Sequence, residues 1–249
     1  MFTESSLRKI KDFFTGDPIV SLYLNTEPSR GNAETHRLRL RNMIKDISLK
    51  QDAETIEKYF TYSYDWAGRS VAVFSCAPAG FFHAIPLAVP VKDFIQIGSK
   101  AAVDPLEDLL EEYSHMGVIL VDKQGARLFH FHLGELVEQE GYLGDLVKQV
   151  KDGGASSAHG LRGGSLVGGR TVRETIDRNQ REIVDMAVKF LEHKRVRRIL
   201  IGGTDENVSH FRNFLPKSMQ SLVVGTFAMA MTANTSEVMQ KVLHTVQGG

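Results

Sequence analysis

The segment GGASSAHGLRGGSLVGGR, residues 153–170, contains seven glycines in eighteen residues and shows no apolar periodicity. Glycine loses more conformational freedom on folding than any other residue, so glycine pairs are typical of backbone that takes a positive φ or approaches another molecule closely. This argument applies to Gly163-Gly164 and again to Gly168-Gly169. We therefore predict a presented loop over residues 153–170; the alternative that composition leaves open is a flexible surface linker.

A long amphipathic helix follows, which we predict over residues 171–194. Its apolar residues recur at spacings of three, four and seven positions: Val172, Ile176, Ile183, Ala187, Phe190 and Leu191. At about 1.5 Å per residue the helix is roughly 35 Å long. The loop is thus mounted at the N-terminal end of a rigid rod, where unpaired backbone N–H groups favour anions. A linker between domains is not normally held in this way.

Basic side chains gather around the glycine pairs and on the polar face of this helix, so the segment can meet an anion. They are His159, Arg162, Arg170, Arg173 and Arg178.

The composition of the 249-residue chain excludes several classes of protein. Its 30 basic and 30 acidic residues give a net charge of zero, so a protein that coats DNA through a global positive field is not expected. The single cysteine, Cys76, allows neither an internal disulfide framework nor a Cys-rich zinc site. No apolar run reaches the roughly 20 residues that span a bilayer. We therefore expect a cytoplasmic protein with no membrane or DNA partner.

The N-terminal half reads as a small α+β domain. Apolar runs bounded by Gly and Pro predict strands over residues 19–24, 70–76, 80–86 and 89–97, the last three being consecutive strands of one sheet. Helical spacing predicts helices over residues 4–14, 33–49, 53–60 and 104–113, with Thr3 or Ser5 as the first cap and Asp104 as the last. We place a boundary near Ser114, which divides the chain into domains 1–113 and 114–249.

The C-terminal half reads as an α/β domain with a mixed central sheet and the long loop-mounted helix. A hairpin is predicted over residues 117–133, around the turn DKQG. Beyond the long helix we predict, in order, a strand over 198–201, a turn GGTDEN, a helix over 208–215, a strand over 221–230 and a helix over 236–246. The turn matches neither nucleotide-binding glycine motif, so Thr204 or Asp205 is interpreted as a helix cap.

No metal, cofactor or hydrolase signature is present. His130 and His132 share one face of a predicted strand, but no third ligand lies nearby in the sequence, so we expect ordinary histidines and no metal site. The chain contains neither G-x-S-x-G nor H-E-x-x-H.

Five sequence segments carry a resemblance to a known family. They are GRSVAVFSC (68–76), VDPLEDLLEEY (103–113), GVILVDKQGARLFHFHLGEL (117–136), HGLRGGSLVGGR (159–170) and RRILIGGTDEN (197–207). In order and in pattern they resemble the archaeo-eukaryotic peptide-chain release factors and their Pelota-like relatives, and most of all the bacterial members. The resemblance covers most of the chain: the first two segments resemble the end of the family's N-terminal domain, and the others its middle domain.

The resemblance implies that the loop enters the ribosomal peptidyl-transferase centre and approaches the ester of peptidyl-tRNA. Gly163 and Gly164 match the family's glycine pair, and Ser165 stands where the family has the glutamine that helps to place a water. The ribosome and tRNA are then partners, with a translational GTPase or another factor as a further one. The resemblance also implies that the basic residues bind RNA, namely His159, Arg162, Arg170, Arg173 and Arg178. No cofactor is implied.

Three departures from the family pattern bear on function. A serine side chain is shorter than glutamine and has one donor, although its backbone N–H can still serve an oxyanion. Residues 48–52 carry no Asn-Ile-Lys-Ser, so stop-codon decoding is not expected, and the family's third, partner-binding domain has no counterpart beyond a start at Ser236. Peptidyl-tRNA hydrolysis, binding without catalysis and cleavage of the tRNA acceptor end therefore remain as alternatives.

Overall fold

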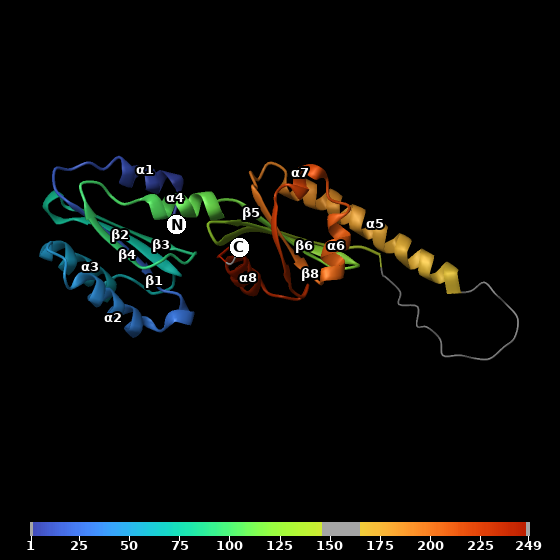
Figure 1. The fold of residues 1–249 in the computed structure, drawn as a ribbon, viewed down its shortest axis with the longest axis horizontal. Helices are drawn as coiled ribbons and strands as arrows, with labels where there is room; N and C mark the ends of the chain where they lie inside the picture. The colour runs from blue at the N-terminus through green and yellow to red at the C-terminus, as the bar shows by residue number, and fades with distance from the viewer. Residues whose placement is uncertain (1, 146–164, 248–249) are drawn as a thin grey trace, which may run out of the picture. The chain divides into compact units, whose positions relative to one another are not determined.

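The computed structural model of the chain describes residues 2–145 and 165–247. The chain divides into two compact units, one comprising Met1–Ser114 with Leu133–Glu135, the other His115–His132 with Leu136–Gly249. Each unit contains one sheet with helices packed on it (Figure 1). The predicted fold class, mixed α/β in two domains, is confirmed.

The first unit is built on an antiparallel sheet of four strands in the order β3-β2-β1-β4. The strands are β1 (Ile19–Asn25), β2 (Ser70–Cys76), β3 (Phe81–Leu87) and β4 (Phe94–Gly98). Every residue of β1 and β2 is buried, because helices cover both faces of the sheet. This explains why their sequences are apolar almost throughout.

The helices of this unit are α1 (Glu4–Lys11), α2 (Ala33–Ile44), α3 (Lys50–Tyr62) and α4 (Asp104–Tyr113). Helices α2 and α3 lie on one face and α1 and α4 on the other (Figure 1). Leu40 of α2 and Ile56 of α3 pack in one core with Leu22 and Val73 of the sheet. Two short 3-10 helices, Pro28–Arg30 and Ala77–Ala79, follow β1 and β2.

The second unit has a mixed sheet in the order β7-β6-β5-β8-β9. The strands are β5 (Met116–Val121), β6 (Gly125–His132), β7 (Glu135–Leu143), β8 (Arg198–Gly203) and β9 (Val223–Ala228). Strand β5 pairs antiparallel with β6 and parallel with β8, and β8 pairs parallel with β9. The carboxyl ends of β5, β8 and β9 therefore lie at the same edge of the sheet.

The helices of the second unit are α5 (Ser165–Leu191), α6 (Asp205–Arg212), α7 (Lys217–Gln220) and α8 (Thr235–Gln247). The first three share one core with one face of the sheet, and α8 lies on the opposite face (Figure 1). The long helix α5 is held along its C-terminal half, where Ile183, Ala187 and Phe190 are buried.

Several sequence-based boundaries are wrong, the most consequential being the end of the predicted loop 153–170. Helix α5 begins at Ser165, so its first residues, Gly168-Gly169 included, are helical. Each glycine costs about 1 kcal/mol of helix propensity relative to alanine. Once a helix is nucleated, however, every further residue adds a hydrogen bond, and two glycines do not end it.

Three other differences have local causes. Strand β7 was not predicted, because it is an edge strand whose residues are mostly exposed, three of them glutamates, and it lacks an apolar pattern. Strand β4 begins at Phe94 and pairs with β1 at the far edge, not beside β3. Asp104 is the first residue of α4 and Val103 is its cap, whereas Thr3 and Thr204 cap α1 and α6 as predicted.

Candidate functional site

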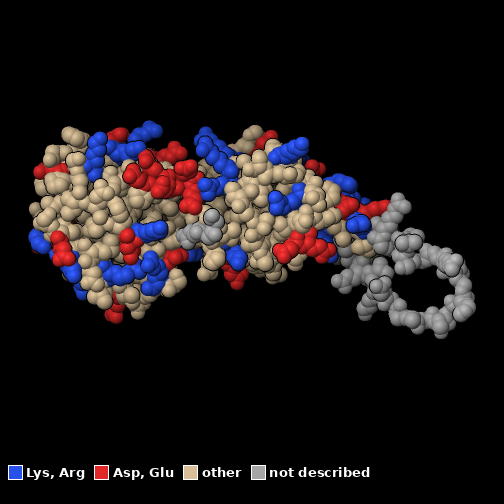
Figure 2. Space-filling view, in the orientation of Figure 1, with Lys and Arg blue, Asp and Glu red and all other residues tan. Residues whose placement is uncertain are grey.

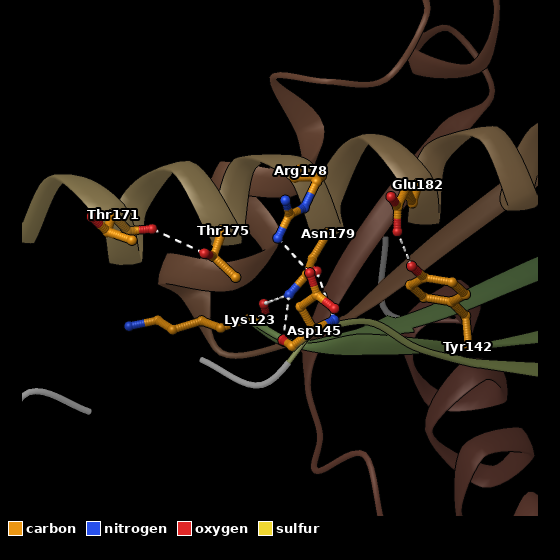
Figure 3. Close-up of polar contacts among 8 residues, drawn as sticks. All are labelled: Lys123, Tyr142, Asp145, Thr171, Thr175, Arg178, Asn179 and Glu182. Carbon is orange, nitrogen blue, oxygen red and sulfur yellow. Dashed lines mark hydrogen bonds and ion pairs between the residues drawn. The ribbon is translucent and has the colours of Figure 1, made fainter. Parts of the chain in front are cut away.

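The candidate site lies where the chain leaves the sheet of the second unit, before residues 146–164, and returns at Ser165 into α5. The chain leaves after β7, at Asp145, beside the middle of α5 (Figure 3). From Ser165 to Asn179 the helix rises roughly 21 Å, at about 1.5 Å per residue. The N-terminal turns of α5 therefore extend well beyond the point at which the chain leaves the sheet.

Asn179 of α5 fixes that point. Its side chain is fully buried. The side-chain Oδ1 accepts a hydrogen bond from the Asp145 backbone N–H at 3.0 Å, and Nδ2 donates to the carbonyl oxygens of Asp145 at 3.0 Å and Lys123 at 3.3 Å. One buried amide thus joins α5 to the turn between β5 and β6 and to the end of β7 (Figure 3). Satisfied buried polar groups of this kind specify a single arrangement of the elements that they join.

Further contacts reinforce the same junction (Figure 3). The Arg178 guanidinium pairs with the Asp145 carboxylate, and the Tyr142 hydroxyl donates to the Glu182 carboxylate, which raises the pKa of Tyr142 to about 12. The Gly144 N–H donates to the Gln124 carbonyl oxygen at 2.7 Å. The last residues before 146 are therefore held from both sides.

Gln180, the neighbour of Asn179, is also buried and donates from Nε2 to the Asp122 carbonyl oxygen at 2.8 Å. Its Oε1 has no hydrogen-bond partner among the residues that the structure describes. Gln180 forms part of the wall of a pocket of about 540 Å³, which α5, α6 and Lys123 enclose at the carboxyl ends of β5 and β8. Arg173 lines the same pocket.

The residues predicted from sequence divide into two groups. Gly163, Gly164, His159 and Arg162 lie outside the described residues, and Ser165 and Arg170 lie in the first turns of α5, with side chains that are not described.

Arg173 and Arg178 are both exposed on α5. Arg173 lines the pocket, whereas Arg178 forms the ion pair with Asp145. These are the two predicted RNA-binding residues whose side chains the structure describes, and they have different surroundings.

Sequence reasoning missed Asn179 and Gln180, although a signal was present. Counted from Ile176, positions 179, 180 and 183 are the ones that continue the apolar stripe of α5. Amide side chains at these positions are expected to be buried, and buried polar groups form hydrogen bonds. The pattern therefore predicts hydrogen bonds from Asn179 and Gln180 to neighbouring elements.

The histidines of β6 were expected to be ordinary ones, and the structure adds a third to them. His115 Nδ1 lies 3.0 Å from His130 Nε2, and the His115 ring stacks on that of His132, with centroids 4.4 Å apart. The hairpin register that pairs Met116 with Phe131 places residue 115 opposite 132, so the turn alone could have indicated this neighbour. Burial, together with the nearby His115, lowers the pKa of His130 to about 4.

Within residues 2–145 and 165–247, no group of three or more His, Cys, Asp or Glu side chains is arranged to hold a metal ion. In the same part of the chain, no helix combines the length and the apolar character that crossing a bilayer requires. On the face shown in Figure 2, both units carry basic and acidic side chains, and acidic side chains gather in one patch on the first unit. Any electrostatic attraction for RNA must therefore be local.

Comparisons with known proteins identify the class. Residues 102–247 match the model of bacterial archaeo-eukaryotic release factor family 10, and the chain belongs to this family. Membership implies a translation role of the termination or rescue type, and an interaction with the ribosome. No curated protein matches the sequence.

Among the solved structures that are similar to the chain are two archaeal ones. One is described as an archaeal protein: it is 14% identical, with a TM-score of 0.38, over 96% of this chain and 68% of that chain. The other, an archaeal translation termination factor aRF1, is 13% identical, with a TM-score of 0.38, over 98% of this chain and 69% of that chain.

Proposed function

We propose that the protein acts at the ribosomal peptidyl-transferase centre or on peptidyl-tRNA, and that the glycine-rich segment with Gly163, Gly164 and Ser165 is the part it inserts. The observation that carries the proposal is the fixed point at which the chain leaves the sheet, together with the long helix into which it returns. The chain leaves at Asp145, which is bonded to the buried Asn179, and re-enters at Ser165, the first residue of a 27-residue helix. In the sequence, Gly163 and Gly164 directly precede that helix.

In this proposal Gly163 and Gly164 allow the backbone to come close to the tRNA end, since they carry no side chain. Ser165 follows them, and its backbone N–H is among the first four of α5, which lack partners within the helix. Such groups favour negative charge, either a phosphate or the oxyanion that forms when water attacks an ester carbonyl. The serine side chain does not reach as far as glutamine, so hydrolysis depends on where the water is held.

The RNA-binding residues of the proposal are His159, Arg162, Arg170, Arg173 and Arg178. Arg178 pairs with Asp145, but the two side chains are 55% and 65% exposed. Exposed ion pairs contribute only about 0–1 kcal/mol, so this arginine can exchange its carboxylate for a phosphate at little cost.

Stop-codon decoding is not part of the proposal. The region around residues 48–52 leads into α3, and Asp52 is buried, accepting hydrogen bonds from Ser75 Oγ at 2.6 Å and the Ala77 N–H at 2.8 Å. A side chain that fastens a helix to its sheet is not available to a codon.

We assign residues 1–113 as a domain like the N-terminal domain of the release factors and residues 114–249 as one like their middle domain. A cytoplasmic location and a translational GTPase as an additional partner complete the proposal.

The test is to incubate the protein with peptidyl-tRNA, alone and on ribosomes, and to resolve the products. A freed peptide identifies a hydrolase, a shortened tRNA identifies a nuclease, and intact tRNA that stays bound identifies a binding module. Gly163→Ala is expected to abolish the activity or the binding with almost unchanged thermal stability. The matched control is Gly160→Ala, in the same segment but outside the pair, which is expected to keep the activity or the binding.

Ser165→Gln separates hydrolysis from binding. If only the serine prevents water placement, this substitution raises peptide release on ribosomes while binding stays the same. Binding to tRNA should also weaken as salt rises, because phosphate contacts release counterions. If neither tRNA nor ribosomes bind at low salt, the proposal is wrong.

A further inference from the structure

Apart from Arg173, the residues of the pocket beside α5 have no role in the function proposed so far. Its volume of about 540 Å³ falls within the range of about 300–1,000 Å³ that small-molecule sites occupy. It lies past the carboxyl ends of the parallel strands β5 and β8, which is where ligands bind in open α/β sheets. Position and size therefore both indicate a binding site.

The walls combine apolar and amide groups. Helix α5 contributes Val172 and Ile176, which are aliphatic and partly exposed, and α6 and the residue after it contribute the side chains of Asn207 and Asn213. Amides carry both donors and acceptors, so they can bond the edge of a base while aliphatic groups cover its face. Gln180 lies in the same wall and is held in place by its bond to Asp122.

The charges at the pocket favour a single anionic group. Lys123 and Arg173 line it together with one carboxylate, Glu206, which lies 3.0 Å from the Lys123 ammonium. His210 also lines it and lies 3.0 Å from Asp177 through Nε2. With histidine neutral, the lining residues carry one net positive charge. That balance suits a phosphodiester better than a polyphosphate, which the carboxylate would repel.

We propose that this pocket binds one unpaired nucleotide of an RNA strand, with its base between the aliphatic side chains of α5 and the amides of α6, and its phosphate at Lys123 and Arg173. The inference builds on the proposed function, because RNA is the partner in both; apart from Arg173, which belongs to both, it depends on different residues. A free nucleoside monophosphate offers the same chemistry, so the experiment must distinguish the two sources.

The experiment measures the affinity of the purified full-length chain for a single-stranded RNA of five nucleotides, for the same RNA in a duplex, and for each free nucleoside 5′-monophosphate. We expect the single strand to bind at least tenfold more tightly than the duplex and the monophosphates. Equal or tighter binding of a free monophosphate would overturn the RNA assignment.

Variants connect the affinity to the pocket. Arg173→Ala is expected to weaken single-strand binding roughly three- to tenfold and to reduce the salt slope by about one. The matched control is Arg212→Ala, which removes the same charge from an exposed position of α6 outside the pocket and should change neither. Ile176→Glu should abolish binding; should that variant not fold, Asn207→Ala, expected to weaken binding severalfold, takes its place.

Equal affinity of the pocket variants and Arg212→Ala would overturn the inference. Gly163→Ala separates it from the function proposed above. That substitution should abolish the ribosomal activity and leave the affinity for the five-nucleotide RNA unchanged. If ribosomes do not bind and the pocket variants still weaken RNA binding, the pocket stands and the proposed function fails.

Discussion

Asn179 and Asp145 exchange two hydrogen bonds, with the Asp145 N–H donating to the Asn179 side chain and the Asn179 amide nitrogen donating back to the Asp145 carbonyl oxygen, both at 3.0 Å. The side chain thus imitates a strand partner for a single residue. Asn179 is fully buried, so its side chain makes this exchange without competition from water at its own end. This pair fixes where the chain leaves the sheet, and the first two predictions test it.

Asn179→Ala is expected to lower the free energy of unfolding by about 2–4 kcal/mol. The substitution removes three hydrogen bonds and leaves a backbone N–H and two carbonyl oxygens without their partner, and a buried unsatisfied group costs about 1–3 kcal/mol. Urea denaturation measures the change. Asn213→Ala, at an exposed position, should stay within about 0.5 kcal/mol of the parent. Equal effects of the two substitutions would show that the Asn179 bonds do not hold the junction.

Gly144→Ala should destabilise the second unit by about 1–3 kcal/mol, the usual cost of overpacking. A Cβ at this position would lie 2.5 Å from Asn179 Oδ1 and 3.0 Å from the Gln124 carbonyl oxygen. Gly141→Ala, three residues earlier and within β7, is the matched control, since a Cβ there meets nothing within 4 Å among the described residues. The measurement is the midpoint of thermal unfolding of each variant. A Gly144→Ala variant as stable as Gly141→Ala would mean that the chain can shift away from α5.

Gly168→Ala should stabilise α5 by about 0.5–1 kcal/mol, because glycine is the poorer helix former and this residue lies inside the helix. The readout is a rise in helical circular dichroism and in the midpoint of unfolding. A loss of stability would indicate that the residue takes a left-handed conformation, as a loop glycine does.

The stability of the second unit should fall as the pH is lowered from about 6.5 to about 4. Burial, with help from the neighbouring positive charges, lowers the pKa of His130 to about 4. The groups facing it are His115, His132, Lys194 and Glu138, of which only the carboxylate raises the pKa. In this pH window the unfolded chain binds a proton that the folded chain does not, so acid favours unfolding.

Denaturation at pH 7, 6, 5 and 4 measures this dependence. His130→Gln should lower stability at pH 7 and flatten the slope between pH 6.5 and 4, whereas His244→Gln, at an exposed position, should leave the slope as it is. An unchanged slope in His130→Gln would assign the acid sensitivity to other groups.

The sequence predicted best the elements whose local pattern is set by burial. Strands β1, β2 and β5 are apolar runs because both faces of each sheet are covered, and they lie where the runs lie. The same logic failed for β7, whose exposed Glu138 and Glu140 give no apolar signal, although the chain pairs there as an edge strand.

The candidate site could be predicted only in part. The glycine pair and the arginines could be identified in the sequence. The two buried amides of α5, Asn179 and Gln180, could also have been identified, because they interrupt its apolar stripe. The pocket could not, because its residues come from α5, α6 and Lys123, and nothing in their local patterns states that these elements meet. The start of α5 was missed because glycine propensity was weighed without the cooperativity of a long helix.

Strands β5 and β8 are direct neighbours in a parallel ladder, although β6, β7, residues 146–164 and α5 all separate them in the chain. The chain between Asp145 and α5 therefore begins and ends outside the ladder of β5 and β8. The entropic cost of closing a loop also grows only slowly with the length of the loop. The segment between Asp145 and α5 can therefore be replaced by a longer, shorter or unrelated one without changing the pairing of β5 with β8. Proteins with this sheet can in this way differ in their chemistry through that segment alone.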